Sequence, residues 1–490
     1  MRRRLLLILA AAVLLVLGTG IAVLLTRHPP SGTLETNVTD VTVVTPTTTA
    51  PQTTPKPPKP PPPKTEPVDR RCWNMFGGGP RRTLARPGID LGVPARKPIW
   101  ARGLKGYVEY PASYCDGVLY VNTFKGDTWA IEAATGKVLW RKLSDAPKPS
   151  TPAIAGDKLI VSSKDGTVTA LTRKSGKVVW QLQTNAKVES SAAVAGDTAY
   201  FGATDGRLFA VDVDTGHVRW AFDTGGRINA SPSLADGRIC ITTYAGSIFC
   251  LRQRNGEKLW STYVKRDAFR YESFYASPST DGQRLYTIAR SGKIVALNAT
   301  SGNVIWTDSV NSLGYSTPAV GTDRIFVGDF NGGLRAYRKT DGKLLWRAHV
   351  GGRILGPPVV VGDLVFFSTL ETETYAARAS DGKIVWHYGL GKYSPGIATE
   401  RAYYFSLNGM LVAFRGKDGP RPGRTANGST RSATRSSGRG ALGSGLPRIE
   451  RARLPGGASA RSSSARHYGR AATRCSSSPV PDTALPLSTM

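Results

Sequence analysis

Short runs of apolar and β-branched residues alternate with polar turns through most of the chain. Typical runs are KLIVS at residues 158–162, TVTAL at 167–171 and KVVWQ at 177–181. Short runs of this composition, bounded by Gly next to Asp, Asn, Ser or Thr, are typical of β-strands joined by tight hairpins. The pattern therefore predicts an all-β region rather than a helical one.

Tryptophan marks a repeat within this region. Successive tryptophans are 40, 40, 40, 40, 46, 40 and 40 residues apart, at Trp100, Trp140, Trp180, Trp220, Trp260, Trp306, Trp346 and Trp386. All but the first follow a glycine by four residues, in phrases such as Thr135-Gly136-Lys137, where Gly can take the positive φ angle of a hairpin turn. An internal period of this length indicates stacked units of one supersecondary motif.

Each unit predicts a four-stranded antiparallel meander whose first strand is short and rich in small residues. One such sheet cannot bury both faces, so the units must stack, and eight units stacked radially close into a ring without long exposed edges. Residues 403–414 supply inner strands with no following Trp, and residues 97–102 form a lone outer strand. We therefore predict an eight-bladed β-propeller whose N-terminal strand completes the last blade and whose tryptophans dock between blades. Seven blades are expected if Trp100 lies outside the ring.

Composition divides the 490 residues into four segments. Residues 1–28 combine three leading arginines with an apolar run of 22 residues, about 33 Å as a helix, which predicts a cytoplasmic stub and a transmembrane signal anchor. A cleaved signal peptide is the alternative. Residues 29–68 hold 12 Pro and 11 Thr and predict a disordered stalk. Residues 69–415 contain all ten Trp, and residues 416–490 predict a basic, low-complexity, disordered tail.

The net charge of +30 is unevenly distributed among these segments. The tail carries +10 and residues 1–28 carry +4, which leaves +16 on the predicted propeller. A basic domain outside the membrane would attract an envelope protein or an anionic cell-wall or lipid component. Nucleic acid is not an expected partner, because the chain is predicted to be extracytoplasmic and has no nucleic-acid recognition motif.

The repeat resembles that of pyrroloquinoline-quinone-type (PQQ-like) β-propellers. The phrase Asp-Gly-x-apolar-x-Ala, followed after five residues by Gly-Lys-apolar-apolar-Trp, is nearly complete from Asp165 to Trp180 and recurs across residues 97–415. Thr372 departs from the pattern by replacing a turn glycine. The family includes quinoprotein dehydrogenases and non-catalytic bacterial envelope members, such as the propeller lipoprotein of the outer-membrane assembly machinery.

For a catalytic member, the resemblance implies a quinone, a calcium ion held by carboxylate and amide side chains, a catalytic aspartate, long insertions and often a vicinal cysteine pair. This chain has no adjacent cysteines and only one internal insertion, of six residues. Asp212 and Asp214 are interpreted as turn residues, because the other oxygen ligands of a calcium loop are missing. We therefore predict no catalytic residues, no metal and no cofactor. Quinone and calcium belong only to the alternative, a quinoprotein oxidoreductase.

The loop that follows each Trp is expected to open on one face, around the central channel. Tyr and Arg are enriched at binding hot spots, so the polar and aromatic residues of these loops are the candidate partner site. These channel-mouth candidates are Tyr107, Glu109, Lys187, Arg227, Asn229, Arg270, Tyr271, Tyr275, Tyr315, Arg353 and Tyr393. The alternative is that they only fill the channel mouth.

The cysteines agree with an exported domain. A Cys72–Cys115 bond would pin the incoming chain to the ring. Cys240 and Cys250 lie on adjacent strands, where a three-residue turn at 244–246 would allow a bond and a two-residue turn would forbid it. Buried free thiols are the alternative for this second pair.

Together these features predict a monomeric, membrane-anchored, extracytoplasmic propeller. Its predicted function is that of a non-enzymatic binding or assembly scaffold in the bacterial cell envelope. The alternatives are the quinoprotein oxidoreductase and a cell-wall polysaccharide-binding module.

Overall fold

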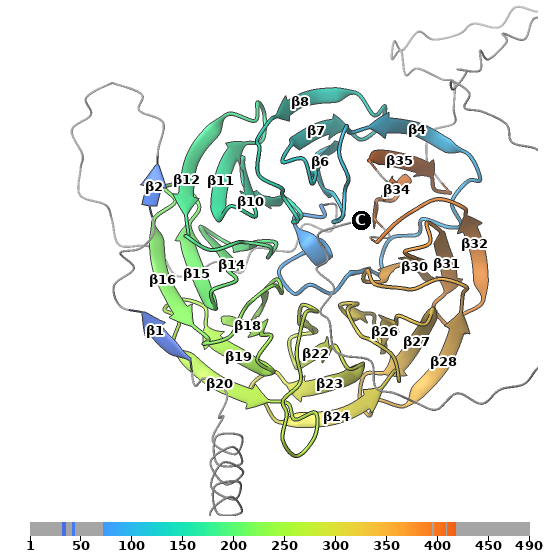
Figure 1. Ribbon diagram of the computed structural model, residues 1–490. Coiled ribbons are helices and arrows are strands. Elements are labelled where there is room, and N and C mark those ends of the chain that lie inside the picture. Colours follow the sequence, from blue (N-terminus) through green and yellow to red (C-terminus); the bar gives the residue numbers. More distant parts are fainter. Residues whose placement is uncertain (1–31, 36–41, 45–71, 394–395, 408, 418–490) are drawn as a thin grey trace, which may run out of the picture. The chain divides into compact units, whose positions relative to one another are not determined.

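Eight antiparallel sheets surround a central axis in the computed structural model, which describes residues 32–35, 42–44, 72–393, 396–407 and 409–417 (Figure 1). Each sheet contains four strands of the repeat, so the predicted eight-bladed, all-β propeller is confirmed and the seven-bladed alternative is wrong. The predicted membrane anchor and nearly all of the predicted tail lie outside the described residues. Within the described part of the chain, no helix has both the length and the apolar character needed to cross a membrane.

The strands of each blade follow the chain from the channel outward. Blades 1 to 4 consist of β5 (Ser113–Cys115), β6 (Val118–Asn122), β7 (Thr128–Glu132) and β8 (Val138–Lys142); β9 (Ala153–Ala155), β10 (Lys158–Ser162), β11 (Thr167–Thr172) and β12 (Val178–Gln183); β13 (Ala193–Ala195), β14 (Thr198–Gly202), β15 (Arg207–Asp212) and β16 (Val218–Asp223); and β17 (Ser233–Ala235), β18 (Arg238–Thr242), β19 (Ser247–Arg252) and β20 (Lys258–Tyr263). Blades 5 to 7 consist of β21 (Ser279–Thr280), β22 (Arg284–Ile288), β23 (Lys293–Asn298) and β24 (Val304–Ser309); β25 (Ala319–Val320), β26 (Arg324–Gly328), β27 (Gly333–Arg338) and β28 (Leu344–His349); and β29 (Val359–Val361), β30 (Leu364–Ser368), β31 (Thr374–Arg378) and β32 (Ile384–Tyr388).

Blade 8 is built from both ends of the repeat region. Its three inner strands are β33 (Ile397–Ala398), β34 (Ala402–Leu407) and β35 (Met410–Arg415), and its outer strand is β4 (Pro98–Gly103). β4 pairs antiparallel with β35 along its length, as the lone N-terminal strand predicted. Hydrogen bonds between strands about 300 residues apart in sequence therefore close the ring.

The tryptophans of the repeat dock one blade onto the next. In each outer strand the Trp lies opposite a small residue, such as Ala336 opposite Trp346. In seven of the eight outer strands its ring packs on the turn glycine of the following blade. Gly342 has a φ of +74°, and a Cβ atom there would lie 2.6 Å from the ring of Trp306. In seven of the eight blades the indole nitrogen also donates to a backbone carbonyl of the following blade, at 2.8–3.2 Å.

The eighth tryptophan makes a different contact. Trp386 packs into blade 8 through aromatic rings, with centroid distances of 5.5 Å to Phe414, 6.2 Å to Tyr403 and 6.5 Å to Phe405. Its indole nitrogen is buried without a hydrogen-bond partner among the described residues. The seam between blades 7 and 8 therefore depends on aromatic packing, where the other interfaces pair Trp with Gly.

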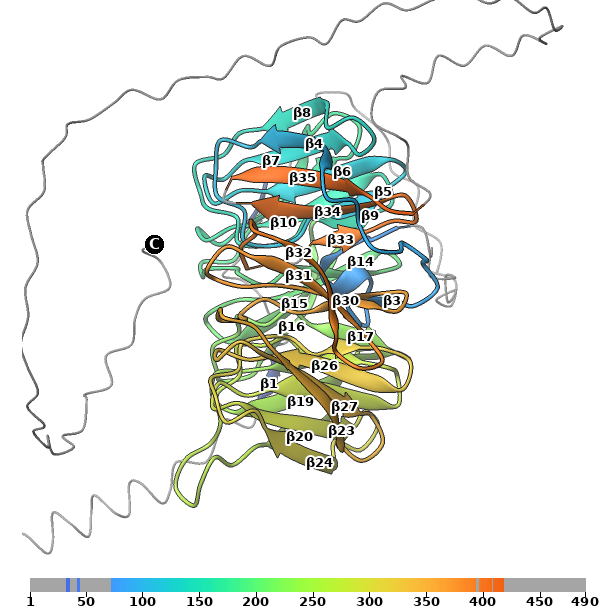
Figure 2. The same ribbon diagram turned by 90° about the vertical axis from the view of Figure 1, so that its right-hand side faces the viewer.

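Residues 72–91, which we call the plug, lie across one end of the channel (Figures 1 and 2). The plug contains the 3-10 helix η1 (Phe76–Gly78) and the strand β3 (Ala85–Arg86), which pairs parallel with β29. Its backbone bonds to the innermost segments of successive blades, through the pairs Trp73 with Tyr114, Asn74 with Ile154, Pro80 with Leu234, Arg81 with Thr280, Thr83 with Val320 and Leu84 with Val360. The Trp73 indole donates to Ala398 of blade 8 at 2.5 Å. Through these bonds one short segment reaches seven of the blades, and the Arg82 side chain reaches the remaining one, blade 3.

Arg82 reaches from the plug into the channel. Its side chain is fully buried, and its guanidinium donates to the carbonyls of Phe76 in the plug, Ser191 in blade 3 and Pro232 in blade 4, at 2.5–2.9 Å. Burial lowers the pKa of Arg82 to about 9, so the group is a cation at neutral pH. A planar, five-donor side chain suits this position, because a lysine could not reach all three carbonyls in one plane.

Both predicted cysteine pairs form disulfides. Cys72 is bonded to Cys115 with a Cα–Cα distance of 4.5 Å, which ties the plug to blade 1. Cys240 and Cys250 are direct cross-strand partners at 4.1 Å and are bonded. The register shows why: the connecting turn has the three residues 244–246, the case that places both side chains on one face.

Two features differ from the sequence pattern. The sequence predicted no strand in residues 29–68, but β1 (Thr33–Glu35) adds to the outer edge of β16, and β2 (Thr42–Val44) adds to that of β12. Their Thr, Leu and Val residues suit extended backbone, and the outer strand of a blade offers unpaired backbone groups. Thr372 keeps the turn geometry of the glycine it replaces, with a φ of +69° that is strained for a β-branched residue.

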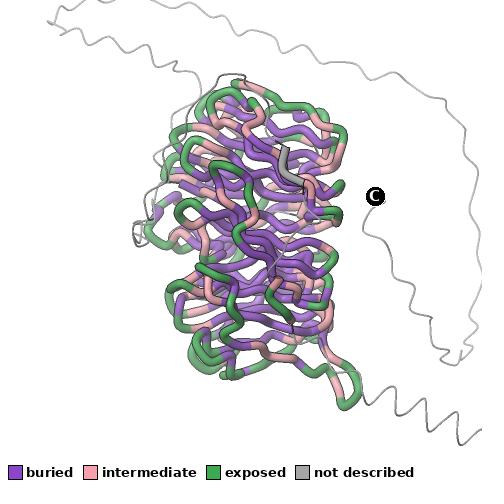
Figure 3. The backbone as a smooth tube through the Cα atoms, turned by 90° about the vertical axis from the view of Figure 1, so that its left-hand side faces the viewer, coloured by how far each residue is buried: buried purple, intermediate pink, exposed green. Residues whose placement is uncertain are grey.

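The fold is layered by burial (Figure 3). Strand interiors are buried, and exposed residues collect in the turns at the two ends of the strands. In a meander, alternate turns lie at opposite ends of the sheet. One face of the ring therefore carries the plug together with the first and third turns of each blade, and the other face carries the second turn and the loop between blades.

Close packing of Trp on Gly predicts an unequal cost for two glycine substitutions. Gly342→Ala should lower the free energy of unfolding by about 1–3 kcal/mol more than Gly117→Ala, because only the first drives a Cβ into an indole ring. Gly117 is the matched control, since its φ is +78° and nothing lies within 4 Å of its Cβ position. Urea unfolding of both variants measures the difference, and equal losses would show that the Trp contact adds nothing.

Candidate functional site

Two loops of each blade form the channel mouth on the face opposite the plug. One loop enters the blade before its innermost strand, and the other is the turn between the second and third strands. A single backbone hydrogen bond joins the two loops in each of seven blades, as between Phe124 N and Tyr107 O at 2.7 Å or Tyr244 N and Arg227 O at 2.9 Å. Side chains of both loops therefore meet at the rim.

Four aromatic rings form a continuous arc on one side of the mouth, across blades 4 to 6. We call them the aromatic arc: Tyr244, Tyr275, Tyr315 and Phe330. Successive ring centroids lie 6.2, 5.8 and 6.3 Å apart, and each of the four side chains is partly exposed. This is the edge-to-face and tilted geometry preferred by aromatic pairs.

Three exposed arginines accompany the aromatic arc. The guanidinium of Arg227 lies 5.3 Å from the ring of Tyr244, and that of Arg353 lies 5.2 Å from the ring of Phe330. Arg290 donates from Nε to the Tyr315 hydroxyl at 3.1 Å. The cations hold the rings in place. Arg353 is also paired with Glu371 at 2.7 Å.

A second aromatic group lies where blades 8 and 1 meet. The ring of Tyr107 packs against Phe124 at 5.8 Å and against Tyr393 at 5.5 Å. The ammonium of Lys392 lies 5.9 Å from the Tyr107 ring and 5.5 Å from the Tyr393 ring. The mouth thus repeats the same combination of aromatic rings and cations at two places.

Polar side chains occupy the inner side of the mouth. Asn229 donates to the carboxylate of Glu189 at 2.5 Å, and Lys164 lies 3.6 Å from the same carboxylate. Burial raises the pKa of Glu109 to about 7, with Lys164 opposing the shift and the Glu189 charge adding to it. The two carboxyl groups are therefore close enough for their charges to interact.

Two tyrosines from opposite sides of the ring lie near each other below this level. Tyr110, in blade 1, and Tyr275, in blade 5, are close enough for each to influence the pKa of the other. Blades 1 and 5 are diametrically opposed in a ring of eight, so this approach spans the axis. Burial raises the pKa of Tyr110 well above its usual value, which keeps the hydroxyl protonated.

The structure gathers most of the predicted site residues and separates two of them. Glu109, Glu189 and Asn229 come together, Tyr275 joins Tyr315, and Tyr107 joins Tyr393. Lys187 is exposed at the rim, where its carbonyl accepts the bond from Thr204.

Arg270 and Tyr271 belong instead to a hairpin formed by the six-residue insertion. Lys265 pairs with Tyr271 there, and the Tyr271 ring packs on Tyr263 of β20 at 6.2 Å. Arg270 is paired with Asp267 at 2.8 Å. Among the described residues, neither side chain contacts the aromatic arc, because the inserted residues carry this loop away from the inner strands.

Sequence reasoning missed the residues contributed by the second loop. These are Phe124, Lys164, Tyr244, Arg290 and Phe330, together with Tyr110 next to a predicted residue. The spacing of the tryptophan repeat also identifies the first five, because they occupy the same position in successive units. Sequence alone does not show that both loops reach the same rim.

The mouth can be tested against the quinone and calcium that the fold family implies. Glu109, Glu189 and the buried, unpartnered Oδ1 of Asn229 are oxygen donors of the kind calcium accepts. However, Lys164 already pairs with the Glu189 carboxylate at 3.6 Å, and burial raises the pKa of Glu109 to about 7, which disfavours its charged form. This donor set does not fit the calcium ion that would accompany a quinone. Asp212 is a turn residue, as predicted, accepting from Asp214 N and Thr215 N.

The raised pKa of Glu109 predicts a pH-dependent gain from Glu109→Gln. Between pH 4.5 and 7 the folded state holds a proton that the unfolded state has lost, so wild-type stability falls as pH rises through this range. At pH 8 the variant should be more stable than wild type by about 1–3 kcal/mol, and near pH 4 the two should be equal. Urea unfolding at both pH values measures this, with the exposed Glu257→Gln as control. A difference independent of pH would contradict the assignment.

Solved structures with the same fold include BamB and two dehydrogenases. BamB from Moraxella catarrhalis is 15% identical, with a TM-score of 0.56 over 66% of this chain and 99% of that chain. A europium-containing methanol dehydrogenase is 14% identical, with a TM-score of 0.61 over 71% of this chain and 98% of that one. The quinohemoprotein alcohol dehydrogenase of Comamonas testosteroni is 15% identical, with a TM-score of 0.58 over 74% and 83%. Identities this low show the fold alone.

The sequence identifies the family more specifically than the fold does. No curated protein sequence matches it significantly. The family model described as outer membrane protein assembly factor BamB matches residues 90–307, 271–351 and 290–454, which together span well over half of the chain and include the whole repeat region from β4 onward. This match confirms the resemblance that the tryptophan and glycine spacing predicted. The chain therefore belongs to the BamB-like family of PQQ-type β-propellers.

Proposed function

We propose that this protein is a non-enzymatic binding and assembly scaffold of the bacterial cell envelope, and that it binds a partner protein through the aromatic arc. The observation that carries the proposal is a set of partly exposed Tyr and Phe rings with exposed Arg side chains at the channel mouth. Such a site offers a surface for contact with a protein.

The chemistry of the arc suits protein recognition. Tyr and Arg dominate binding hot spots, because each combines a large contact area with a polar group of fixed geometry. Here the rings are held by one another and by the adjacent guanidiniums, so little side-chain freedom would be lost on binding. The membership of a family described as an outer membrane protein assembly factor supports the same class of function.

The location is part of the proposal. Residues 1–28 would anchor the chain in the cell membrane with the N-terminus in the cytoplasm, and the propeller would lie outside. Two disulfides in the described domain are consistent with an oxidising, extracytoplasmic compartment. The charge of +16 on the propeller segment would favour an acidic partner surface and make the encounter salt-dependent.

Site-specific crosslinking tests the partner surface. A photoreactive residue at position 315 in intact cells should give a discrete adduct with an envelope protein, and the same residue at 344 should not. Leu344 is the matched control, since it is an exposed apolar side chain on β28 of the same blade. In the full-length protein, the double variant Tyr275→Ala, Tyr315→Ala should weaken capture at a third mouth position, 227, by tenfold or more.

Two outcomes would oppose this proposal. Equal adducts at 315 and 344 would show that the arc is not a specific surface. An adduct that contains wall polysaccharide in place of protein would favour the polysaccharide-binding alternative.

Quinone addition tests the competing enzyme. Pyrroloquinoline quinone with calcium, added to the purified protein, should give no saturable spectral change and no dye-linked oxidation of alcohols or sugars, because Lys164 already pairs with Glu189 at the mouth. A saturable change would overturn the scaffold proposal.

A further inference from the structure

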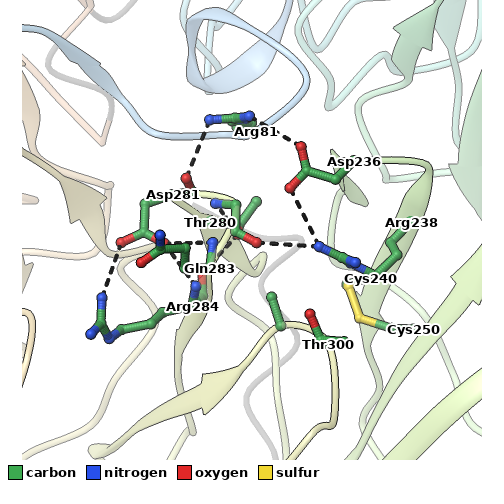
Figure 4. Close-up of polar contacts among 12 residues, drawn as sticks. Arg81, Asp236, Arg238, Cys240, Cys250, Thr280, Asp281, Gln283, Arg284 and Thr300 are labelled. Carbon is green, nitrogen blue, oxygen red and sulfur yellow. Dashed lines mark hydrogen bonds and ion pairs between the residues drawn. A yellow bond between two sulfur atoms is a disulfide. The ribbon is translucent and has the colours of Figure 1, made fainter.

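A polar hollow of about 400 Å³ lies between blades 4 and 5, on the plug face and so away from the aromatic arc. Turns of both blades line it: Asp236, Arg238, Gly282, Gln283, Arg284, Asn298, Thr300 and Ile305. Figure 4 shows Arg238 near Asp236 and Arg284 with its guanidinium directed toward Asp281, with Arg81 of the plug above them. A volume of this size is in the range of small-molecule sites.

The hollow has more cationic groups than carboxylates. Asp236 is shared between Arg81, at 3.5 Å, and Arg238, at 3.3 Å. Asp281 accepts from Lys339 at 3.1 Å, while Arg284 lies 4.0 Å from it. Among the residues that line the hollow, Asp236 is the one carboxylate and Arg238 and Arg284 are the two cations, so the lining carries a net charge of +1.

Asp281 accepts hydrogen bonds from other groups and does not neutralise the Arg284 guanidinium. Burial acts to raise the pKa of Asp281, but hydrogen bonds from Arg284 N and from the Lys339 ammonium outweigh it and hold the pKa below its usual value. The remaining contact to the Arg284 guanidinium, at 4.0 Å, is beyond hydrogen-bond distance.

The two lining guanidiniums are held in place with donors to spare. Arg238 makes only long contacts, at 3.3 Å to Asp236 and 3.3 Å to Gly282 O, and its side chain is 19% exposed. The Nε of Arg284 is buried and has no hydrogen-bond partner among the described residues. Buried N–H groups without acceptors are costly, so an acceptor supplied by a ligand would be stabilised here.

We propose that this hollow binds the anionic group of a small ligand, a phosphate or a carboxylate, between Arg238 and Arg284. Guanidinium groups recognise both anions through paired N–H donors. Arg81 orients Asp236 from the plug, and Thr300 and Ile305 line the part that would take the rest of the ligand. This second site is independent of the partner surface at the channel mouth.

Titration of the full-length protein with defined probes tests the site. The probes are inorganic phosphate, glycerol 3-phosphate and N-acetylalanine, with glycerol and N-acetylalaninamide as uncharged controls, all at constant ionic strength. We expect saturable binding of at least one anion by calorimetry and none of either control. Binding of the phosphates alone or of the carboxylate alone identifies the source of the anion.

Variants assign the binding to the hollow. Arg238→Gln with Arg284→Gln should weaken it at least tenfold, whereas Arg252→Gln, which removes a cation from the same hairpin outside the hollow, should leave it unchanged. If the double variant does not fold, Thr300→Phe blocks the hollow from its exposed side without removing a charge, and should give the same loss. Absence of saturable anion binding, or unchanged binding in these variants, would overturn the proposal.

Discussion

The structure depends on a constraint that each blade faces equally: a four-stranded sheet has two apolar faces and cannot bury them alone. The contact that solves it is an indole ring laid on a glycine of the next blade. Glycine is required there twice over, because the backbone has a positive φ and because a Cβ would enter the ring. Since this contact recurs at a fixed spacing, it sets the period of the sequence and the angle between blades together.

Ring closure then determines what the centre of the molecule can be. The last blade is completed by β4, and the plug that precedes β4 in the chain is carried across the channel, where it bonds to one blade after another. Arg82 enters the channel from that side and is satisfied by carbonyls alone. Tyr110 and Tyr275 approach each other from opposite blades. The two candidate sites, the mouth and the hollow, lie on the two faces of the ring.

The two faces have different chemistry for a structural reason. At the mouth, a backbone hydrogen bond joins the two loops of a blade, and these loops present aromatic rings and cations. This arrangement suits contact with a protein surface. On the plug face, turns of adjacent blades diverge between blades 4 and 5 and leave a hollow whose arginines outnumber its acids. The proposed partner surface and the proposed anion site can therefore act separately, since no described contact joins them.

The sequence by itself determined the repeat and the four-stranded unit, and it indicated the strand that closes the ring, because these follow from local periodicity and from where the period is broken. It left open the choice between seven and eight blades, which depended on whether Trp100 lies in the ring. It also left the disulfides open, since the Cys240–Cys250 bond depended on the length of one turn. Only the tertiary structure decided which loops share the mouth, that Tyr110 approaches Tyr275 across the ring, that Arg270 and Tyr271 lie elsewhere, and that Arg238 and Arg284 line one hollow. The distances between these residues depend on how the blades turn about the axis, which no local pattern encodes.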